Sequence, residues 1–78
     1  MLRQFQSVHF IGICGTAMAS AAAALKGMGV QVTGSDENIY PPMSTFLIER
    51  GIDVFEGYHR DNLIPAPDMV VVGNATIP

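Results

Sequence analysis

The residues of this chain with the clearest chemical potential form one glycine-containing segment, Gly12-Ile13-Cys14-Gly15-Thr16-Ala17-Met18. The segment follows a short β-prone run and opens an alanine-rich stretch, which predicts a loop between a strand and a helix. Unpaired N–H groups at the start of a helix bind phosphate oxygens, and glycine lets a ligand approach the backbone closely. The segment therefore indicates a loop that binds a nucleotide diphosphate, and its candidate contacts are Gly12, Cys14, Gly15, Thr16, Ala17 and Met18.

The segment departs from the dinucleotide-binding pattern G-x-G-x-x-G at two positions. Cys14 occupies the second glycine position, where a side chain holds a pyrophosphate further from the backbone. Ala17 occupies the third, where alanine is permitted, and Gly15 partly restores room for a close approach. These departures weaken the case for an NAD(P)-binding module of an oxidoreductase, which stays open as an alternative interpretation.

An acidic residue, Asp36, follows the second β-prone run. In dinucleotide-binding folds an acid about 20 residues after the glycine loop accepts hydrogen bonds from ribose hydroxyls, and a carboxylate also suits the donor edge of a uracil. The alternative is a local role, because Asp and Asn form caps and Asx-turns in segments such as residues 34–38. The two roles are compatible, so Asp36 is a candidate site residue and Asn38 is an additional one.

The other reactive side chains do not form a catalytic constellation. A helix N-terminus lowers a thiol pKa, but neither histidine has a spacing that would make Cys14 half of a dyad. His9 lies within the first β-prone run and is expected to pack in the sheet, whereas Tyr58 and His59 follow the third run and are additional ligand candidates. One cysteine cannot form a disulfide or a cysteine-based zinc cluster, and the methionines fit core and loop packing. We therefore predict no catalytic residue and no metal site in this chain.

Length and composition limit the classes of protein that the chain can represent. Its 78 residues are 49% apolar and 14% charged, which is the composition of a globular chain with at most one domain. The net charge of −3 argues against nucleic acid or an anionic membrane as a partner, because both attract basic surfaces. A single cysteine fits a reducing, cytoplasmic setting. Residues 8–25 imitate a signal peptide, but glycine and polar residues interrupt them, so we expect neither a leader nor a membrane helix.

Alternating β-prone and helix-forming runs predict the elements that position these residues. Strands are predicted over residues 8–13, 31–34, 52–55 and 69–72. Helices are predicted over residues 16–28 and through residues 46–50, the second capped by Ser44 or Thr45, with a single helical turn at residues 61–63. The last run is continuously apolar, which is typical of a buried parallel strand. The order predicts a three-layer, Rossmann-like α/β fold with a parallel sheet of order 3-2-1-4, truncated before its last helix and strand.

Three segments together resemble the N-terminal domain of the Mur ligases: residues 12–18, residues 34–45 and Gly73-Asn74-Ala75. The resemblance extends over nearly the whole chain, and it implies that residues 1–78 are a fragment that binds the UDP part of UDP-N-acetylmuramate. It places the loop of residues 12–18 against the diphosphate and Ser35-Asp36 against the uridine. It also places Asn74 and Ala75 beside the same crevice, at the carboxyl end of the fourth strand.

The resemblance further implies an ATP-dependent ligase in which ATP and magnesium are held by a central domain absent here, along with a C-terminal domain. No Gly-x-x-x-x-Gly-Lys-Ser/Thr loop occurs in the 78 residues, so we predict that this fragment alone is inactive. Cys14 and residues 40–45 favour the branch that attaches L-alanyl-γ-D-glutamyl-meso-diaminopimelate during peptidoglycan recycling over the branch that attaches L-alanine. A non-catalytic α/β interaction module is a further alternative.

Overall fold

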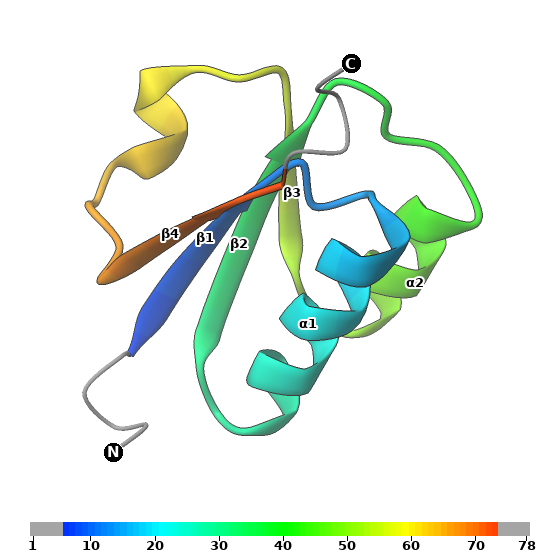
Figure 1. The fold of residues 1–78 in the computed structure, drawn as a ribbon, viewed down its shortest axis with the longest axis horizontal. Coiled ribbons are helices and arrows are strands. Elements are labelled where there is room, and N and C mark those ends of the chain that lie inside the picture. Colours follow the sequence, from blue (N-terminus) through cyan, green and yellow to red (C-terminus); the bar gives the residue numbers. More distant parts are fainter. Residues whose placement is uncertain (1–5, 74–78) are drawn as a thin grey trace.

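The computed structural model describes residues 6–73 and contains a four-stranded parallel sheet in the order β3-β2-β1-β4 (Figure 1). The strands are β1 (Ser7–Ile11), β2 (Gln31–Asp36), β3 (Asp53–Glu56) and β4 (Met69–Val72). Helix α1 (Thr16–Gly27) follows β1, helix α2 (Met43–Glu49) follows β2, and the 3-10 helix η2 (Arg60–Leu63) follows β3. The predicted α/β class, element order and strand order are therefore confirmed.

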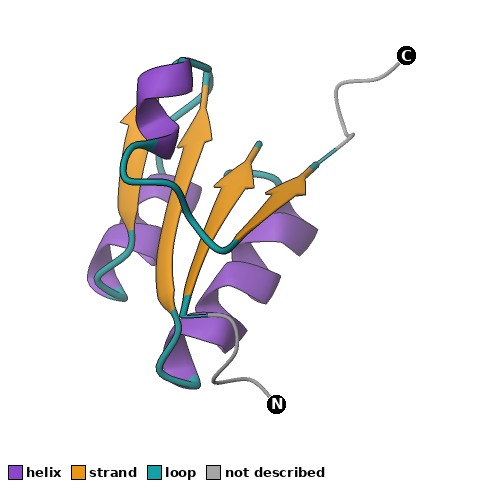
Figure 2. Ribbon diagram, turned by 90° about the vertical axis from the view of Figure 1, so that its left-hand side faces the viewer, coloured by secondary structure: helices purple, strands orange, loops and turns teal. Residues whose placement is uncertain are grey.

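Helices α1 and α2 pack against each other on one face of the sheet, while η2 and the loop that leads to β4 cross the other face (Figure 2). The side chains of β1 point alternately to these two faces. Val8 and Phe10 join the apolar core with the helices, whereas His9 points to the opposite face. In the parallel register His9 lies beside Thr33 of β2 and Val70 of β4. The sheet is thus covered by two helices on one side and by a 3-10 turn and loop on the other.

Helix α1 is rich in alanine, and its buried residues Ala19 and Ala22 let it lie close to the sheet. Helix α2 begins one residue before the predicted cap. Pro42 is its N-cap residue and no side chain caps it, while Ser44 is buried inside the helix, so the predicted cap by Ser44 or Thr45 is wrong. Within residues 6–73, no helix combines the length and apolar character that crossing a membrane requires.

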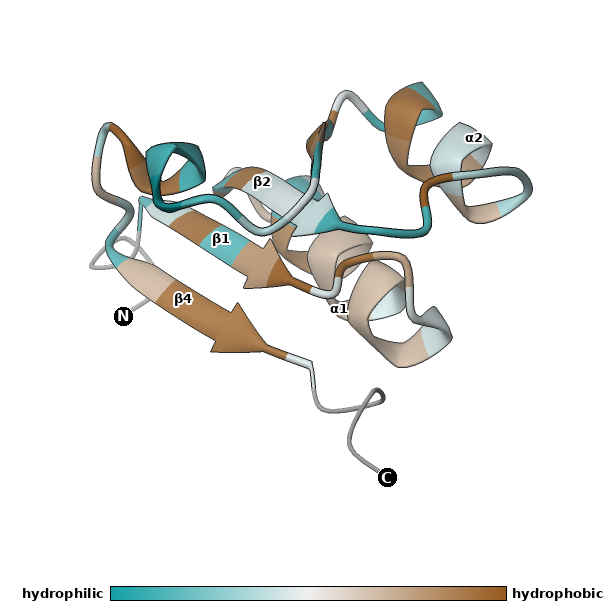
Figure 3. Cartoon of the chain, turned by 90° about the horizontal axis from the view of Figure 1, so that it is seen from above, coloured by the Kyte–Doolittle hydropathy of each residue, from teal (hydrophilic) through white to brown (hydrophobic). Residues whose placement is uncertain are grey.

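The predicted burial of the fourth strand is also wrong. Strand β4 forms an edge of the sheet and is coloured as apolar along its length in Figure 3, although its burial pattern is mostly exposed. Val72 is 65% exposed, and only Val71 packs against the core from the side of the helices. The apolar run correctly predicted a strand, and the predicted order 3-2-1-4 correctly placed it at the edge beside β1; only the burial that the run suggested is absent.

Candidate functional site

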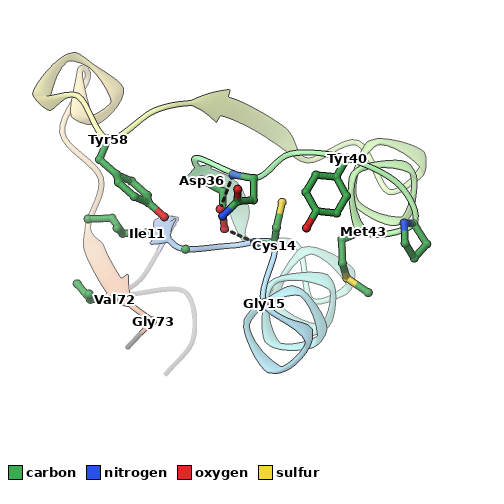
Figure 4. Close-up of a pocket in the computed structure, with 12 residues that line it drawn as sticks. Ile11, Cys14, Gly15, Asp36, Tyr40, Met43, Tyr58, Val72 and Gly73 are labelled. Atoms are coloured by element: carbon green, nitrogen blue, oxygen red, sulfur yellow. Dashed lines mark hydrogen bonds between the residues drawn. The ribbon is translucent and has the colours of Figure 1, made fainter. Parts of the chain in front are cut away.

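A cavity of about 510 Å³ lies where the carboxyl ends of the parallel strands meet the loops that follow them (Figure 4). Its walls come from the β1–α1, β2–α2 and β3–η2 loops and from the end of β4. This is the edge at which open α/β sheets bind ligands. Six predicted residues line the cavity: Gly12, Cys14, Gly15, Asp36, Asn38 and Tyr58.

The carboxylate of Asp36 joins two of the loops that form the cavity. Its Oδ2 accepts a hydrogen bond from the Cys14 N–H at 2.9 Å, and its Oδ1 accepts one from the Asn38 N–H at 2.9 Å. The backbone carbonyl of Asp36 accepts a third bond, from the Gly57 N–H of the β3–η2 loop. The contact with Asn38 is the predicted Asx-turn. Asp36, which is 7% exposed, therefore connects three loops of the site.

The N–H groups of the glycine loop are mostly engaged inside the protein. The Ser35 carbonyl accepts hydrogen bonds from the N–H groups of Gly12 and Ile13, at 2.8 and 3.1 Å, and the Gly15 N–H bonds the Gly12 carbonyl. The Cys14 N–H bonds Asp36. The next three N–H groups, in the first turn of α1, have no acceptor among residues 6–73, and they belong to Thr16, Ala17 and Met18. Phosphate binding by this segment would therefore use the first turn of the helix.

Two glycines of this region are required by geometry, and Gly15 is not. Gly12 has φ +87°, a conformation that favours glycine. A Cβ on Gly34 would lie 2.6 Å from Ile13 Cβ, because the fully buried Ile13 side chain packs on this part of β2. A Cβ on Gly15 would meet only ordinary contacts, 3.6 Å from the Gly12 oxygen and 3.8 Å from Met18 Cγ. A side chain at position 15 would therefore be compatible with the fold, and the glycine found there leaves free space beside the cavity.

The structure places the other predicted residues outside the cavity walls. Ser35 is 1% exposed, and its hydroxyl contacts His9 on the far face of the sheet. Thr16, Ala17 and Met18 lie beyond Gly15 at the start of α1, and His59 folds over Gly57. Asn74 and Ala75 lie outside the described residues.

Local electrostatics argue against Cys14 as a nucleophile. Burial raises the pKa of its thiol, and the nearby negative charge of Asp36 raises it further. The thiolate that a nucleophilic cysteine needs is therefore disfavoured. The same two causes, burial and the charge of Asp36, raise the pKa of Tyr58, so its phenol stays a neutral hydrogen-bonding group.

Sequence reasoning did not select Tyr40 and Met43, which complete the wall on the side of α2. In Figure 4 the Tyr40 ring lies across the cavity from Tyr58, with Asp36 and Cys14 between them. Tyr40 and Tyr58 follow the carboxyl ends of β2 and β3, and the position in the sequence that marked Tyr58 as a candidate site residue could have marked Tyr40 as well.

The cavity wall, as far as residues 6–73 form it, contains no lysine or arginine and one carboxylate, Asp36. That part of the chain also contains no cluster of three or more His, Cys, Asp or Glu side chains able to hold a metal ion. Together with the absence of a Gly-Lys-Ser/Thr loop from the sequence, these residues do not fit a site for ATP and magnesium. An anion in the cavity would therefore be bound by uncharged donors, such as backbone N–H groups at the positive end of the helix dipole, and not by a cationic side chain of the described wall.

A loop at the carboxyl end of β1, a helix N-terminus and an acid at the carboxyl end of β2 form the arrangement expected of a nucleotide-binding α/β domain. A sequence model of the Mur ligase family, described as its catalytic domain, matches residues 7–78. The chain belongs to the Mur ligase family. The resemblance seen in the glycine loop and in residues 34–45 is thereby confirmed for this Mur ligase.

Relatives of this Mur ligase chain include ligases named for two different amino components. The UDP-N-acetylmuramate–L-alanyl-γ-D-glutamyl-meso-2,6-diaminoheptandioate ligases of Haemophilus influenzae and Escherichia coli K12 are 59% and 50% identical to it over 68 residues, 87% of the chain. A UDP-N-acetylmuramate–L-alanine ligase of Psychrobacter is 39% identical over 74 residues. The chain spans 15% of the length of each of these three relatives.

Solved structures of related ligases have the same fold. The murein peptide ligase from Psychrobacter arcticus matches 90% of the chain with a TM-score of 0.87 and 56% identity. The UDP-N-acetylmuramate:L-alanyl-γ-D-glutamyl-meso-diaminopimelate ligase from Neisseria meningitides matches 91% with a TM-score of 0.83 and 44% identity. The chain covers 15% and 22% of those two structures, so it corresponds to a small part of each.

Proposed function

We propose that this chain is the UDP-binding N-terminal domain of a cytoplasmic Mur ligase that uses UDP-N-acetylmuramate. In the intact enzyme the muramyl carboxylate would be joined to L-alanyl-γ-D-glutamyl-meso-diaminopimelate during peptidoglycan recycling. The observation that carries the proposal is the cavity at the carboxyl ends of the strands, with the open N–H groups of α1 beside it. The names of the two relatives at 59% and 50% identity support the choice of substrate.

The proposed arrangement follows from which groups are still able to bond a ligand. The diphosphate would lie at the first turn of α1, where the N–H groups of Thr16, Ala17 and Met18 and the positive end of the helix dipole attract an anion. The uridine would occupy the cavity beside Asp36, whose carboxylate oxygens each accept one bond and can accept more. Tyr40 and Tyr58 would flank the base or ribose.

Ligation itself would require residues outside this chain. ATP supplies the phosphoryl group that activates the muramyl carboxylate in this family, and the residues present do not fit a site for ATP or magnesium. The proposed contribution of this chain is therefore to bind and orient the nucleotide end of the substrate. The isolated chain is expected to bind UDP-N-acetylmuramate and to catalyse neither ATP hydrolysis nor ligation.

A second candidate is the corresponding domain of a UDP-N-acetylmuramate–L-alanine ligase, which the 39% identity to the Psychrobacter relative favours. Both candidates would use the same nucleotide substrate and would differ in the amino component. An assay of a full-length enzyme containing this sequence, with L-alanine and with L-alanyl-γ-D-glutamyl-meso-diaminopimelate as alternative substrates, distinguishes the two candidates. Faster turnover with L-alanine would assign the chain to the second candidate.

Titration of the chain with UDP-N-acetylmuramate, UDP and NAD tests nucleotide recognition. The two uridine nucleotides should raise the melting temperature and shift the amide resonances of Thr16, Ala17 and Met18, whereas NAD should do neither. A ligand at 100 times its Kd stabilises a folded protein by about 2.7 kcal/mol, which is easily measured. Binding of NAD without binding of UDP-N-acetylmuramate would assign the chain to the oxidoreductase class. Binding of neither would favour a non-catalytic interaction module.

A pair of glycine substitutions separates ligand contact from folding. Threonine is about as good an N-cap as glycine, so Gly15→Thr adds a branched side chain beside the cavity with little loss of helix stability. We expect it to raise the Kd for UDP-N-acetylmuramate at least about tenfold, which is about 1.4 kcal/mol. Gly27→Thr at the other end of α1, where a Cβ meets no atom within 4 Å, is the matched control. Equal loss of binding and stability in Gly15→Thr would instead indicate a structural glycine.

A further inference from the structure

A buried polar cluster lies on the sheet face opposite the two helices. The His9 ring of β1 contacts two hydroxyl groups of β2: its Nδ1 lies 2.8 Å from Thr33 Oγ1 and its Nε2 lies 3.1 Å from Ser35 Oγ. Phe55 of β3 stacks on the His9 ring, with a centroid distance of 6.4 Å and an interplanar angle of 13°. His9 and Ser35 are each 1% exposed. Both ring nitrogens therefore have specific partners, and the His9 ring and the Ser35 hydroxyl are shielded from water.

Ser35 connects this cluster to the candidate UDP site. Its hydroxyl contacts His9, while its carbonyl accepts the N–H groups of Gly12 and Ile13 and so holds the start of the glycine loop. Successive side chains of a strand point to opposite faces. A Ser35 side chain held on the His9 face therefore directs the next side chain, that of Asp36, to the other face, where its carboxylate accepts the Cys14 N–H.

We infer that His9 is a positioning residue for the nucleotide site, acting through Ser35 on the glycine loop and on the direction of the Asp36 carboxylate. The inference rests on the proposed function. A β-branched apolar residue would suit a strand interior at least as well as histidine for packing alone. A fully satisfied buried polar cluster instead specifies one arrangement of the groups around it. Burial lowers the pKa of His9, which keeps the ring neutral so that one nitrogen donates and the other accepts.

The two contacts of His9 can be separated by substitution. The side-chain amide of glutamine reaches the position of Nε2, and that of asparagine reaches the position of Nδ1, so His9→Gln keeps the Ser35 contact and His9→Asn keeps the Thr33 contact. His9→Leu removes both. His9→Asn leaves the buried Ser35 hydroxyl without its partner, whereas His9→Gln frees the half-buried Thr33 hydroxyl, so His9→Asn should be the less stable of the two. The glycine loop is therefore compared well below both unfolding midpoints, where both variants are fully folded.

The experiment measures the amide resonances of Gly12, Ile13 and Cys14 in the ligand-free chain and the Kd for UDP-N-acetylmuramate. His9→Gln should keep the parental resonances and a Kd within about twofold of the parent. His9→Asn and His9→Leu should shift the resonances and raise the Kd about tenfold, which is about 1.4 kcal/mol. Ser35→Ala should reproduce the effect of His9→Asn, and Thr33→Val is the matched control that should leave the loop unchanged.

Equal effects of the glutamine and asparagine variants on the loop resonances would overturn the inference and leave His9 as a core residue. If the His9 variants do not fold, the comparison of Ser35→Ala with Thr33→Val decides, and equal shifts in that pair would also overturn it. If the parent chain does not bind UDP-N-acetylmuramate, the proposed function fails. The ligand-free resonances still decide whether His9 positions the loop.

Discussion

Replacing Asp36 by asparagine should loosen two loops of the site before any ligand binds. The carboxylate accepts one hydrogen bond from Cys14 N–H and one from Asn38 N–H, both at 2.9 Å. An asparagine side chain has nearly the same shape but offers one oxygen, and its NH₂ group would face the second N–H. The third loop contact of this residue uses its backbone carbonyl and should persist in the variant.

The size of the effect follows from these two bonds. A hydrogen bond to a charged group contributes about 1.5–3 kcal/mol, and Asp36→Asn loses one such bond and weakens the other. Asn38 is exposed, so water can satisfy its N–H in the variant. We therefore expect the free energy of unfolding to fall by about 2–3 kcal/mol when the nearly buried Asp36 side chain is replaced. A chain of 78 residues has a free energy of unfolding of about 4–12 kcal/mol. The melting temperature should therefore fall by about 8–24 °C.

Thermal unfolding and amide resonances of the ligand-free chain measure this prediction. The resonances of Cys14 and Asn38 should move, while that of Gly57, bonded to the Asp36 backbone carbonyl, should stay in place. Asp53→Asn, an exposed acid at the start of β3, is the matched control and should change stability by less than about 0.5 kcal/mol. An Asp36→Asn variant with the parental melting temperature and weaker binding would show that Asp36 contacts the ligand without organising the loops.

Three further predictions follow from packing and titration. Gly34→Ala should destabilise the chain by about 1–3 kcal/mol, because the added Cβ would overlap Ile13. The control Gly27→Ala, whose Cβ would lie in open space, should be neutral or stabilising. Equal melting temperatures of these two variants would refute the prediction. Burial lowers the pKa of His9 below 6.5, so the unfolded chain binds more protons than the folded chain below that pH. The free energy of unfolding, measured by urea titration, should therefore fall more between pH 7 and pH 5 in the parent than in His9→Gln. Equal losses in the two proteins would contradict this prediction. Because the pKa of Cys14 is raised above 9.0, iodoacetamide at pH 8 should alkylate it more slowly in the folded chain than in urea, and faster alkylation when folded would refute the assignment.

The fold was predictable because each element has a strong local signal. Apolar runs of β-prone residues and the alanine-rich stretch of α1 produce opposite backbone preferences, and their alternation leaves few parallel-sheet topologies. The errors concern properties that depend on neighbours in space. An apolar run such as Met69–Val72 has the same composition whether its side chains are covered or exposed. Ser44 is a good capping residue by type, yet its burial in α2 removes it from the capping position.

The sequence predicted which loops line the candidate cavity. Gly12, Cys14, Gly15 and Asp36 were selected because glycine, helix formers and a carboxylate have distinct physical uses at strand ends, and all four line the cavity. The assignment of individual donors was not predictable, because N–H groups of one loop are claimed by acceptors from another strand. The Ser35 side chain illustrates this, since its contact with His9 on the far face could not be inferred without the register of β1 and β2.

The combination of an internal carboxylate and the absence of basic side chains along the described cavity wall constrains how a diphosphate can bind. Asp36 bonds the Cys14 N–H and brings a negative charge into the cavity, so an anion placed at Cys14 would be repelled and would find its donor occupied. The open donors begin at Thr16, on the side of the helix dipole that attracts anions. The phosphates of a bound nucleotide should therefore lie toward α1 and its base toward Asp36 and Tyr58. We infer this orientation of the nucleotide from which N–H groups already have acceptors within the protein, and not from the glycine pattern alone.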